Sequence, residues 1–306
     1  MRALVTGCHG LLGQTIWATC PVGIELVGAD LLPKSPLFPE EQYNGIDLAH
    51  RSTVLQLIDD LRPTWIINAA AYTNVDGAEK ERKLCWQGNV TAVENLALAA
   101  RKHRIKLLHI STDYIFDGKH GPYDEEQVPN PLGYYGRSKL AGENVLRASG
   151  IDFLIIRTMV LYGHHRMGKH NFVTWLLQEL ARENPVRVVN DQWGNTTLAD
   201  ELAAGIWQAV SRNYLGTLNV AGIEIIDRYS FAVRIAQKFG YDEKLLQPIS
   251  TAELKQAAPR PMRSGLVVEK AIRELGLQLS DINQGLEKFR AFFSKDISSN
   301  HGNSGS

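Results

Sequence analysis

Short apolar runs alternate with longer amphipathic segments along the first half of this 306-residue chain. The short runs are rich in Ile, Leu and Val, a composition typical of strands buried on both faces of a parallel sheet. They lie at Ala3–Thr6, Glu25–Ala29, Trp65–Asn68, Lys106–Ile110 and Phe153–Arg157. Helical segments are expected between them, at Leu11–Thr19, Ser52–Leu61, Cys85–His103 and Gly136–Ser149. This alternation predicts an α/β fold of the Rossmann type, a doubly wound parallel sheet.

The second half is less regular and predicts a smaller α/β substrate-binding lobe that is interleaved with the first. Its expected elements are helices near Asn171–Arg182, Ala199–Ser211, Tyr229–Phe239 and Asp281–Phe293, and a strand at Val186–Val189. We assign residues 1–158 to an NAD(P)-binding Rossmann domain, to which segments near 186–221 return. Residues 159–185 and 222–293 then form the smaller lobe. The polar, Gly/Ser/Asn-rich stretch 294–306 is expected to be a flexible tail.

Composition and charge argue against several classes of partner. The chain carries 33 basic and 33 acidic residues, so nothing in the charge balance favours nucleic acid or an acidic membrane surface. No apolar run is long enough to cross a membrane, and the first residues lead directly into a strand without a signal-peptide pattern. Cys8, Cys20 and Cys85 have neither metal-ligand nor disulfide spacing. We therefore expect a cytoplasmic protein that binds neither nucleic acid nor membrane.

A glycine-rich loop directly follows the first strand. Its spacing is G-x-x-G-x-x-G, one residue longer at its start than the dinucleotide-binding fingerprint. Glycines allow a tight turn and close approach of a pyrophosphate, and the helix N-terminus presents N–H groups to the anion. The candidate cofactor-binding residues of this loop are Gly7, His9, Gly10, Leu11, Leu12 and Gly13.

Asp30 follows the second strand, where an acidic residue would bond the adenosine ribose of a dinucleotide. A strand-end aspartate that only shapes a turn would look the same in the sequence. An acid here repels a 2′-phosphate and favours NADH over NADPH, although Lys34 offsets part of that repulsion. The expected cofactor is therefore NADH or NADPH, with a mild preference for NADH.

A phenol and an ammonium group stand four positions apart at Tyr135 and Lys139, which places both on one face of a helix. A free tyrosine has a pKa of about 10, and a neighbouring ammonium is expected to lower it towards the working range of a proton donor. A hydroxyl from another segment, such as Thr112, would hold a carbonyl oxygen beside the phenol. Ordinary surface helices show the same spacing, so the upstream glycine loop is what favours a carbonyl-reducing site.

With these pieces placed, the chain resembles the extended short-chain dehydrogenase/reductases, and among them the dTDP-4-dehydrorhamnose reductase family. The resemblance extends over nearly the whole chain up to about Phe293. The segments that carry it are Asn68–Asp76, Ser111–Gly118, Pro122-Tyr123, Tyr135–Glu143, Arg157-Thr158, Tyr162-Gly163, Asp191-Gln192, and Arg260-Pro261 with Ser264.

The resemblance implies a Thr-Tyr-Lys triad at Thr112, Tyr135 and Lys139. Thr112 would bond the sugar C4 carbonyl oxygen, Tyr135 would donate its proton, and Lys139 would lower the tyrosine pKa and hold the nicotinamide ribose. Asn89 would help to hold a proton-relay water. The implied reaction is NAD(P)H-dependent reduction of a nucleotide-linked 6-deoxy-4-keto sugar, dTDP-4-dehydro-L-rhamnose to dTDP-L-rhamnose first among them.

Further contacts are implied for the cofactor and the substrate. The cofactor would pass close to Ala69, Ala70, Ala71 and Tyr72 and meet Asp47 and Leu48 at the adenine edge, besides contacting Tyr135 and Lys139. The implied substrate-binding residues are Thr112, Asp113, Tyr114, Tyr135, Val160 and Arg260. The resemblance also allows a homodimer.

Two positions depart from the family pattern, both on the expected substrate side. The family usually has tryptophan where this chain has Val160, and asparagine where it has Arg263. A stacking platform is lost and a cation is gained. The hydride chemistry is unaffected by these changes, whereas the identity of the sugar does not follow from the resemblance.

Two other features of the sequence could be mistaken for functional groups. The run 164–170 contains three histidines but no fixed tetrahedral ligand set, so we predict no metal site and a loop in which Arg166 or Lys169 is available to a diphosphate. Tyr134 adjoins Tyr135, but its five-residue step to Lys139 places it on another helix face, which indicates packing or a substrate contact.

Two alternative functions are retained. One is a non-catalytic binding subunit similar to the methionine adenosyltransferase regulatory subunit, which has this fold and acts by partnering an enzyme. The other is an epimerase or dehydratase on the same fold, which would retain its cofactor through the catalytic cycle.

Overall fold

The central sheet has seven strands in the order β11-β6-β5-β4-β1-β2-β3, and every neighbouring pair is parallel. The structure is a computed structural model that describes the backbone of residues 1–300 and the side chains of residues 1–291. The strands are β1 (Arg2–Thr6), β2 (Glu25–Asp30), β3 (Tyr43–Gly45), β4 (Trp65–Asn68), β5 (Lys106–Thr112), β6 (Phe153–Thr158) and β11 (Gly216–Asn219). The predicted doubly wound α/β fold is confirmed.

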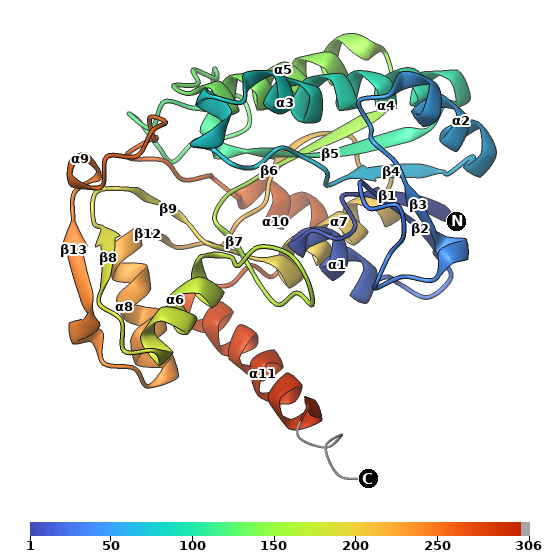
Figure 1. Cartoon of the computed structure of the whole chain (residues 1–306). Coiled ribbons are helices and arrows are strands. Elements are labelled where there is room, and N and C mark those ends of the chain that lie inside the picture. The colour runs from blue at the N-terminus through green and yellow to red at the C-terminus, as the bar shows by residue number, and fades with distance from the viewer. Residues whose placement is uncertain (301–306) are drawn as a thin grey trace.

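Helices cover both faces of this sheet, as Figure 1 shows. One face carries α2 (Arg51–Leu61), α4 (Ala92–His103) and α5 (Tyr134–Ser149), and the other carries α1 (Leu11–Ala18), α7 (Ala199–Ser211) and α10 (Glu269–Leu275). Each layer has its own apolar core, because strands buried on both faces present side chains to both helix layers. The sheet is therefore a rigid platform for groups at its edge.

Three details of this lobe differ from the expected elements. The predicted helix 85–103 is divided into α3 (Arg82–Trp86), a π-helical segment (Gln87–Thr91) and α4. The sheet also gains β3 and β11, which are three and four residues long and too short to produce a clear apolar run.

The second lobe is built from small sheets and helices around a separate apolar core. The strand pairs are β8 (Val186–Val189) with β13 (Leu246–Ile249), β9 (Trp193–Asn195) with β12 (Ile225–Asp227), and β7 (Leu161–Tyr162) with β10 (Thr197–Leu198). The helices are α6 (Phe172–Ala181), α8 (Arg228–Phe239), α9 (Thr251–Leu254) and α11 (Ile282–Asn300). Short 3-10 turns lie at Glu40–Gln42, Gly77–Glu79, Asp113–Ile115 and Glu243–Leu245.

The chain crosses between the lobes more than once. Of the segment 186–221, α7 and β11 lie with the first sheet, whereas β8 and β9 pair inside the second lobe with β13 and β12. At the C-terminus, α11 continues to Asn300, beyond its expected end at Phe293, and residues 301–306 of the expected tail lie outside the described part. No helix in the described part is long and apolar enough to cross a membrane.

Candidate active site

The groups expected to bind the cofactor meet where the central strands end. Thr6 pairs with Asn68, and Asn68 pairs with His109, so β1 and β4 end side by side next to β5, which continues to Thr112. The glycine loop, the segment after β4 and the Thr112 end of β5 consequently share one edge of the sheet. In open parallel sheets this carboxyl edge is where ligands bind.

The glycine loop is packed so closely that side chains would not fit. Gly7 has a positive φ of 70°, and a Cβ placed on it would lie 2.6 Å from the Ala70 nitrogen. A Cβ on Gly13 would lie less than 3.0 Å from the Gly7 carbonyl oxygen. The loop thus brings backbone N–H groups and the start of α1 to one concave turn, which fits the pyrophosphate of a dinucleotide.

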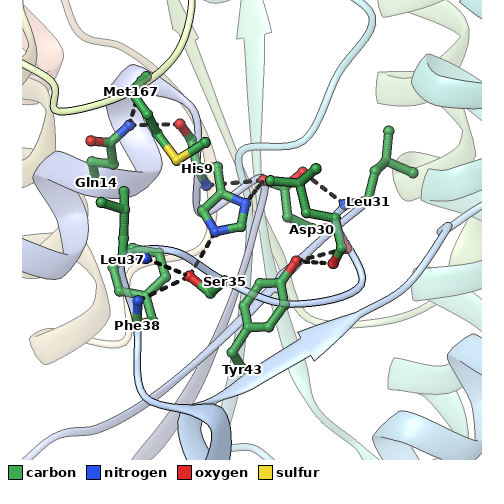
Figure 2. Close-up of polar contacts among 10 residues, drawn as sticks. His9, Gln14, Asp30, Leu31, Ser35, Leu37, Phe38, Tyr43 and Met167 are labelled. Atoms are coloured by element: carbon green, nitrogen blue, oxygen red, sulfur yellow. Dashed lines mark hydrogen bonds and ion pairs between the residues drawn. The ribbon is translucent and has the colours of Figure 1, made fainter.

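Figure 2 shows how Asp30 is held beside this loop. Its two carboxylate oxygens accept hydrogen bonds from the main-chain nitrogens of His9 (2.9 Å) and Leu31 (2.8 Å). The His9 Nε2 atom lies 2.8 Å from the Ser35 hydroxyl, which already accepts the N–H groups of Leu37 and Phe38. A hydroxyl has two acceptor positions and one proton, so Ser35 donates to Nε2 and the proton of a neutral His9 lies on Nδ1.

That His9 Nδ1 atom is buried without a hydrogen-bond partner and lies 3.7 Å from the Asp30 carboxylate. The His9 ring is stacked on Phe38, with ring centroids 5.6 Å apart, and tilted against Tyr43. An unpaired donor beside a carboxylate is the pattern that a ribose diol satisfies, since its hydroxyls both donate and accept. The residues present therefore fit a nicotinamide dinucleotide.

The other expected cofactor contacts surround this edge. The Ala69 nitrogen donates to the Thr6 carbonyl, and Ala70 borders Gly7. The main chain of Tyr72 exchanges two hydrogen bonds with the Asn89 amide. Asn89 also donates to the Ser138 hydroxyl at 2.9 Å, so this side chain braces the segment after β4 against α5.

Asp47 and Leu48 lie just beyond β3, the outermost strand of the sheet. One Asp47 oxygen accepts the Ala49 N–H, and the carboxylate is about half exposed. Leu48 is buried in the core under α2 and α4, and its carbonyl accepts a hydrogen bond from Asn95. Any contact of Leu48 with an adenine ring would therefore have to come from its main chain.

Thr112 and Tyr135 come together across the β5 end and the start of α5. The Tyr135 ring is buried, and the ring of Tyr114 meets it edge-on at 5.6 Å between centroids. The Thr112 hydroxyl accepts the Tyr114 N–H and donates to Asp113 Oδ1 at 3.2 Å, and its closeness to the phenol favours the ionised form of Tyr135. Gly136 makes this approach feasible, because a Cβ there would lie less than 3.0 Å from the Tyr114 carbonyl.

The structure corrects the expectation that the pKa of Tyr135 lies below its ordinary value. Burial raises the pKa of Tyr135 above its ordinary value and outweighs the opposing hydrogen bond from Thr112. The Lys139 Nζ atom donates to the Ile110 carbonyl at 2.6 Å and lies 3.3 Å from His109 Nε2. Burial lowers the pKa of Lys139 itself to about 8. The phenol is therefore a fully protonated donor at neutral pH.

A small cleft between the lobes adjoins this pair. Asp113 at its floor is buried and accepts a hydrogen bond from the Ser264 hydroxyl at 2.8 Å. Burial raises the pKa of Asp113 to about 6, with the Ser264 hydrogen bond acting against it. Tyr114, Val160 and Arg228 also line the cleft.

The structure supports two of the remaining substrate-side expectations and does not support the third. Arg260 bonds Asp76 at 2.8 Å and lies over the Tyr114 ring, close to the cleft. Val160 lines the cleft with a positive φ of 44°, a strained conformation for a β-branched residue. Arg263, in contrast, has an exposed side chain and is not among the cleft-lining residues, so its expected place on the substrate side is not supported.

Sequence reasoning missed two site residues. Arg228 begins α8 in the second lobe, and no local motif connects it with Asp113. His109 is fully buried against Lys139, and its only signal was a polar residue inside an apolar strand.

The 164–170 loop lies against the glycine loop. Gln14 fastens it, because its amide donates to the His9 and Met167 carbonyls and accepts the Arg166 N–H. Figure 2 shows Gln14 between His9 and Met167. Arg166 and Lys169 are thus carried to the cofactor edge of the sheet.

In the described part of the chain, one group of side chains lies close enough together to hold a metal ion: Cys8, His9 and Asp30. Burial raises the pKa of Cys8 to about 12, and the Asp30 oxygens already accept main-chain N–H groups. Thiolate formation here is unfavourable, so this cluster argues weakly for a metal. The histidines of the 164–170 loop do not belong to it.

Comparisons with known proteins agree with this geometry. A family model described as the RmlD substrate binding domain matches residues 1–294. The chain is 33% identical over 305 residues to dTDP-4-dehydrorhamnose reductase from Aggregatibacter actinomycetemcomitans, covering 95% of this chain and 99% of the relative. It is also 31% identical to methionine adenosyltransferase 2 subunit beta from Rattus norvegicus, covering 90% and 83%.

Among solved structures, dTDP-4-dehydrorhamnose reductase from Bacillus anthracis in complex with NADP superimposes with a TM-score of 0.81 at 30% identity, covering 95% of this chain and 98% of that one. The match in sequence and the match in fold both extend over nearly the full length of each partner. The chain belongs to the dTDP-4-dehydrorhamnose reductase family and is an oxidoreductase of the extended short-chain dehydrogenase/reductase type.

Proposed function

We propose that the protein reduces the C4 keto group of a nucleotide-linked 6-deoxy-4-keto sugar, with dTDP-4-dehydro-L-rhamnose as the first candidate and dTDP-L-rhamnose as its product. The observation that carries this proposal is the meeting of Thr112 with a buried, protonated Tyr135 beside a cleft at the carboxyl edge of the sheet. NADH or NADPH is the proposed hydride donor.

Each residue of the proposed triad has a distinct task. Thr112 positions the carbonyl oxygen by donating its hydroxyl proton to it, and Tyr135 transfers its phenolic proton to the same oxygen. Lys139 stabilises the phenolate that remains, since its ammonium is one helical turn away. When bound, the reduced nicotinamide supplies the hydride. Burial keeps water away from the phenol, so the proton is available only to a bound substrate.

The cofactor would lie along the carboxyl edge of the strands. Gly7, Gly10 and Gly13 with the start of α1 would hold its pyrophosphate, and His9 and Asp30 its adenosine ribose. A 2′-phosphate would approach the Asp30 carboxylate, so we propose a preference for NADH. The sugar would lie in the cleft, against Asp113, Tyr114, Val160 and Arg260.

The test is a reductase assay that follows nicotinamide absorbance with freshly prepared dTDP-4-keto-sugar and either cofactor. We expect turnover that Tyr135→Phe reduces by roughly 10²–10⁴-fold while cofactor affinity stays within a few-fold. Tyr241→Phe, in the second lobe, is the matched control and should keep full activity. No absorbance loss with either cofactor would refute the proposal.

A second candidate function is favoured by the similarity to methionine adenosyltransferase 2 subunit beta, which is named as a subunit of another enzyme. In that case the protein would co-purify with a synthetase in fixed stoichiometry and show no turnover. An epimerase or dehydratase would instead turn over substrate without net consumption of NADH. Both outcomes differ from stoichiometric cofactor oxidation.

A further inference from the structure

A row of buried polar side chains crosses the otherwise apolar sheet and ends at Lys139. Thr6 on β1, Asn68 on β4 and His109 on β5 are neighbours in register, and all three are buried. Thr6 Oγ1 lies 2.7 Å from Asn68 Oδ1, and Asn68 Nδ2 lies 2.9 Å from His109 Nδ1. His109 Nε2 lies 3.3 Å from Lys139 Nζ. Buried polar groups are costly unless each has a partner, so this row requires a reason.

Counting donors and acceptors shows that the row is linked to the charge of Lys139. If Thr6 donates to Asn68 and the Asn68 amide nitrogen donates to Nδ1, the proton of a neutral His109 lies on Nε2 and points at Nζ. That arrangement is satisfied only when Lys139 is an uncharged amine with a free lone pair. It therefore belongs to the deprotonated lysine.

The charged lysine requires the opposite order. An ammonium donates to the Ile110 carbonyl, at 2.6 Å, and to an unprotonated Nε2. The His109 proton is then on Nδ1, and a half-turn of the Asn68 amide lets its oxygen accept that proton and its nitrogen donate to Thr6. His109 therefore offers a hydrogen-bond partner to either state of Lys139.

The charged and titratable groups around Lys139 are Glu143, Cys85, Tyr135 and His109. Burial lowers the pKa of Lys139, whereas Glu143 and then Cys85 raise it. Of these four groups, His109 is the one within hydrogen-bond distance of Nζ. Glu143 on α5 lies one turn away, but its carboxylate is bonded to Arg157 from β6 at 2.9 Å. Cys85 on α3 is a buried thiol whose pKa burial raises, and Tyr135 on α5 is a protonated phenol. The π-helical segment that packs here carries no titratable side chain in its sequence, Gln87–Thr91.

We propose that His109 is a positioning residue for the reductase reaction, which holds Nζ of Lys139 against β5 and stabilises its charged form by accepting a hydrogen bond from it. The inference rests on the proposed function, in which Tyr135 needs a cation beside it. Burial, with the charge of Lys139 second, holds the pKa of His109 well below its usual range, so the imidazole is a neutral acceptor. A hydrogen bond to an ionised group is stronger than one between neutral groups.

Removing the acceptor at His109 should lower the pKa of Lys139. His109→Leu leaves the ammonium facing an apolar wall, which favours the uncharged amine and lowers the pKa of Lys139 by about one unit. Activity that depends on the charged lysine is lost as pH rises through that pKa. The alkaline limb of the kcat/KM profile should therefore move about one pH unit towards neutrality.

Glutamine at the same position is the informative variant. His109→Gln keeps an acceptor oxygen on a side chain of similar reach, so its alkaline limb should stay near that of the wild type. A merely structural role for His109 would lower kcat in both variants without moving the limb. His120→Leu, an exposed histidine, is the matched control.

The titration of Lys139 can be measured without turnover. Lysine labelled with ¹³C at Cε gives one signal per side chain, and the Lys139 signal is identified by its loss in Lys139→Met. We expect this signal to titrate at lower pH in His109→Leu than in the wild type and His109→Gln. If the leucine variant does not fold, His109→Met replaces it, since its sulfur is a weak acceptor.

A folded variant lacking the acceptor whose Lys139 signal titrates as in the wild type would overturn the inference. So would an alkaline limb that fails to move while kcat falls. If the wild type reduces no keto sugar, the proposed reaction fails, but the ¹³C titration still decides whether His109 controls the charge of Lys139.

Discussion

Gly136 fixes the distance between the two groups that we place on the carbonyl oxygen. It follows Tyr135 on α5, and a Cβ built on it would lie less than 3.0 Å from the Tyr114 carbonyl, which belongs to the turn after Thr112. Ordinary carbon–oxygen contacts are longer, so Gly136→Ala must push α5 away from this turn by about 1 Å. The phenol would then leave the Thr112 hydroxyl by a similar amount.

The expected cost falls on catalysis rather than on stability. A misplacement of about 1 Å in a reacting group lowers the rate by roughly 100-fold. Overpacking costs about 1–3 kcal/mol, but replacing an interior helical glycine by alanine returns about 1 kcal/mol, so the net loss of stability is small. The variant should therefore fold, bind cofactor, and turn over about 100-fold more slowly.

The assay compares kcat, KM and thermal unfolding for Gly136→Ala and for Arg137→Ala, whose side chain is exposed on the next position of the same helix. Arg137→Ala should keep wild-type kcat. The reasoning is wrong if Gly136→Ala retains kcat within about threefold of the wild type, because the turn and α5 would then adapt without separating the two groups.

Three further predictions concern stability and the cofactor. Glu143→Gln breaks a buried pair with Arg157 and should cost about 3–5 kcal/mol in urea unfolding. Burial raises the pKa of Glu143, but Arg157 lowers it by more, so the folded pKa lies below the unfolded one. The stabilisation from the ion pair is therefore present above the unfolded pKa and is lost as pH falls through the folded pKa. A stability difference between Glu143→Gln and the wild type that persists in strong acid would contradict this. Asp30→Asn removes a negative charge from the expected ribose site and should shift the Kd ratio of NADPH to NADH by about tenfold towards NADPH, as measured by fluorescence titration; an unchanged ratio would place the 2′ position elsewhere. Val160→Asn places a residue that tolerates positive φ where valine has a φ of 44°, and should raise the free energy of unfolding in urea by about 1 kcal/mol; a decrease would show that lost apolar packing outweighs the relief of strain.

Much of the first lobe was predictable from the sequence because its strands are apolar and its helices amphipathic over several turns. β3 and β11 were missed because three or four residues do not establish a period. The π-helical segment was read as continuous helix, since an extra residue in one turn leaves the apolar pattern nearly unchanged. In the second lobe, strand pairing depends on partners far apart in the chain, which local pattern does not reveal.

In the candidate site too, features carried by local motifs were predictable, and features that depend on packing between distant segments were not. Thr112, Tyr135 and Lys139 lie in motifs whose spacing already describes their chemistry. The proton state of the tyrosine did not follow, because burial depends on Tyr114, Cys85 and the rest of the packed cluster. His109 was equally invisible, since its role arises only when β5 and α5 are packed together.

The structure also moves the question of sugar identity to different residues. Arg263 is exposed outside the cleft, whereas Arg228 lies within it, near Asp113 and Tyr114. Val160 lines the cleft with a positive φ, a conformation that strains a β-branched side chain. An apolar side chain at Val160 and a cation at Arg228 thus line the same cleft, and we expect them to limit which substituents a bound sugar can carry. We therefore propose that substrate choice depends on how the second lobe places Arg228 in the cleft, whereas the proposed hydride chemistry depends on Thr112, Tyr135 and Lys139 at the sheet edge.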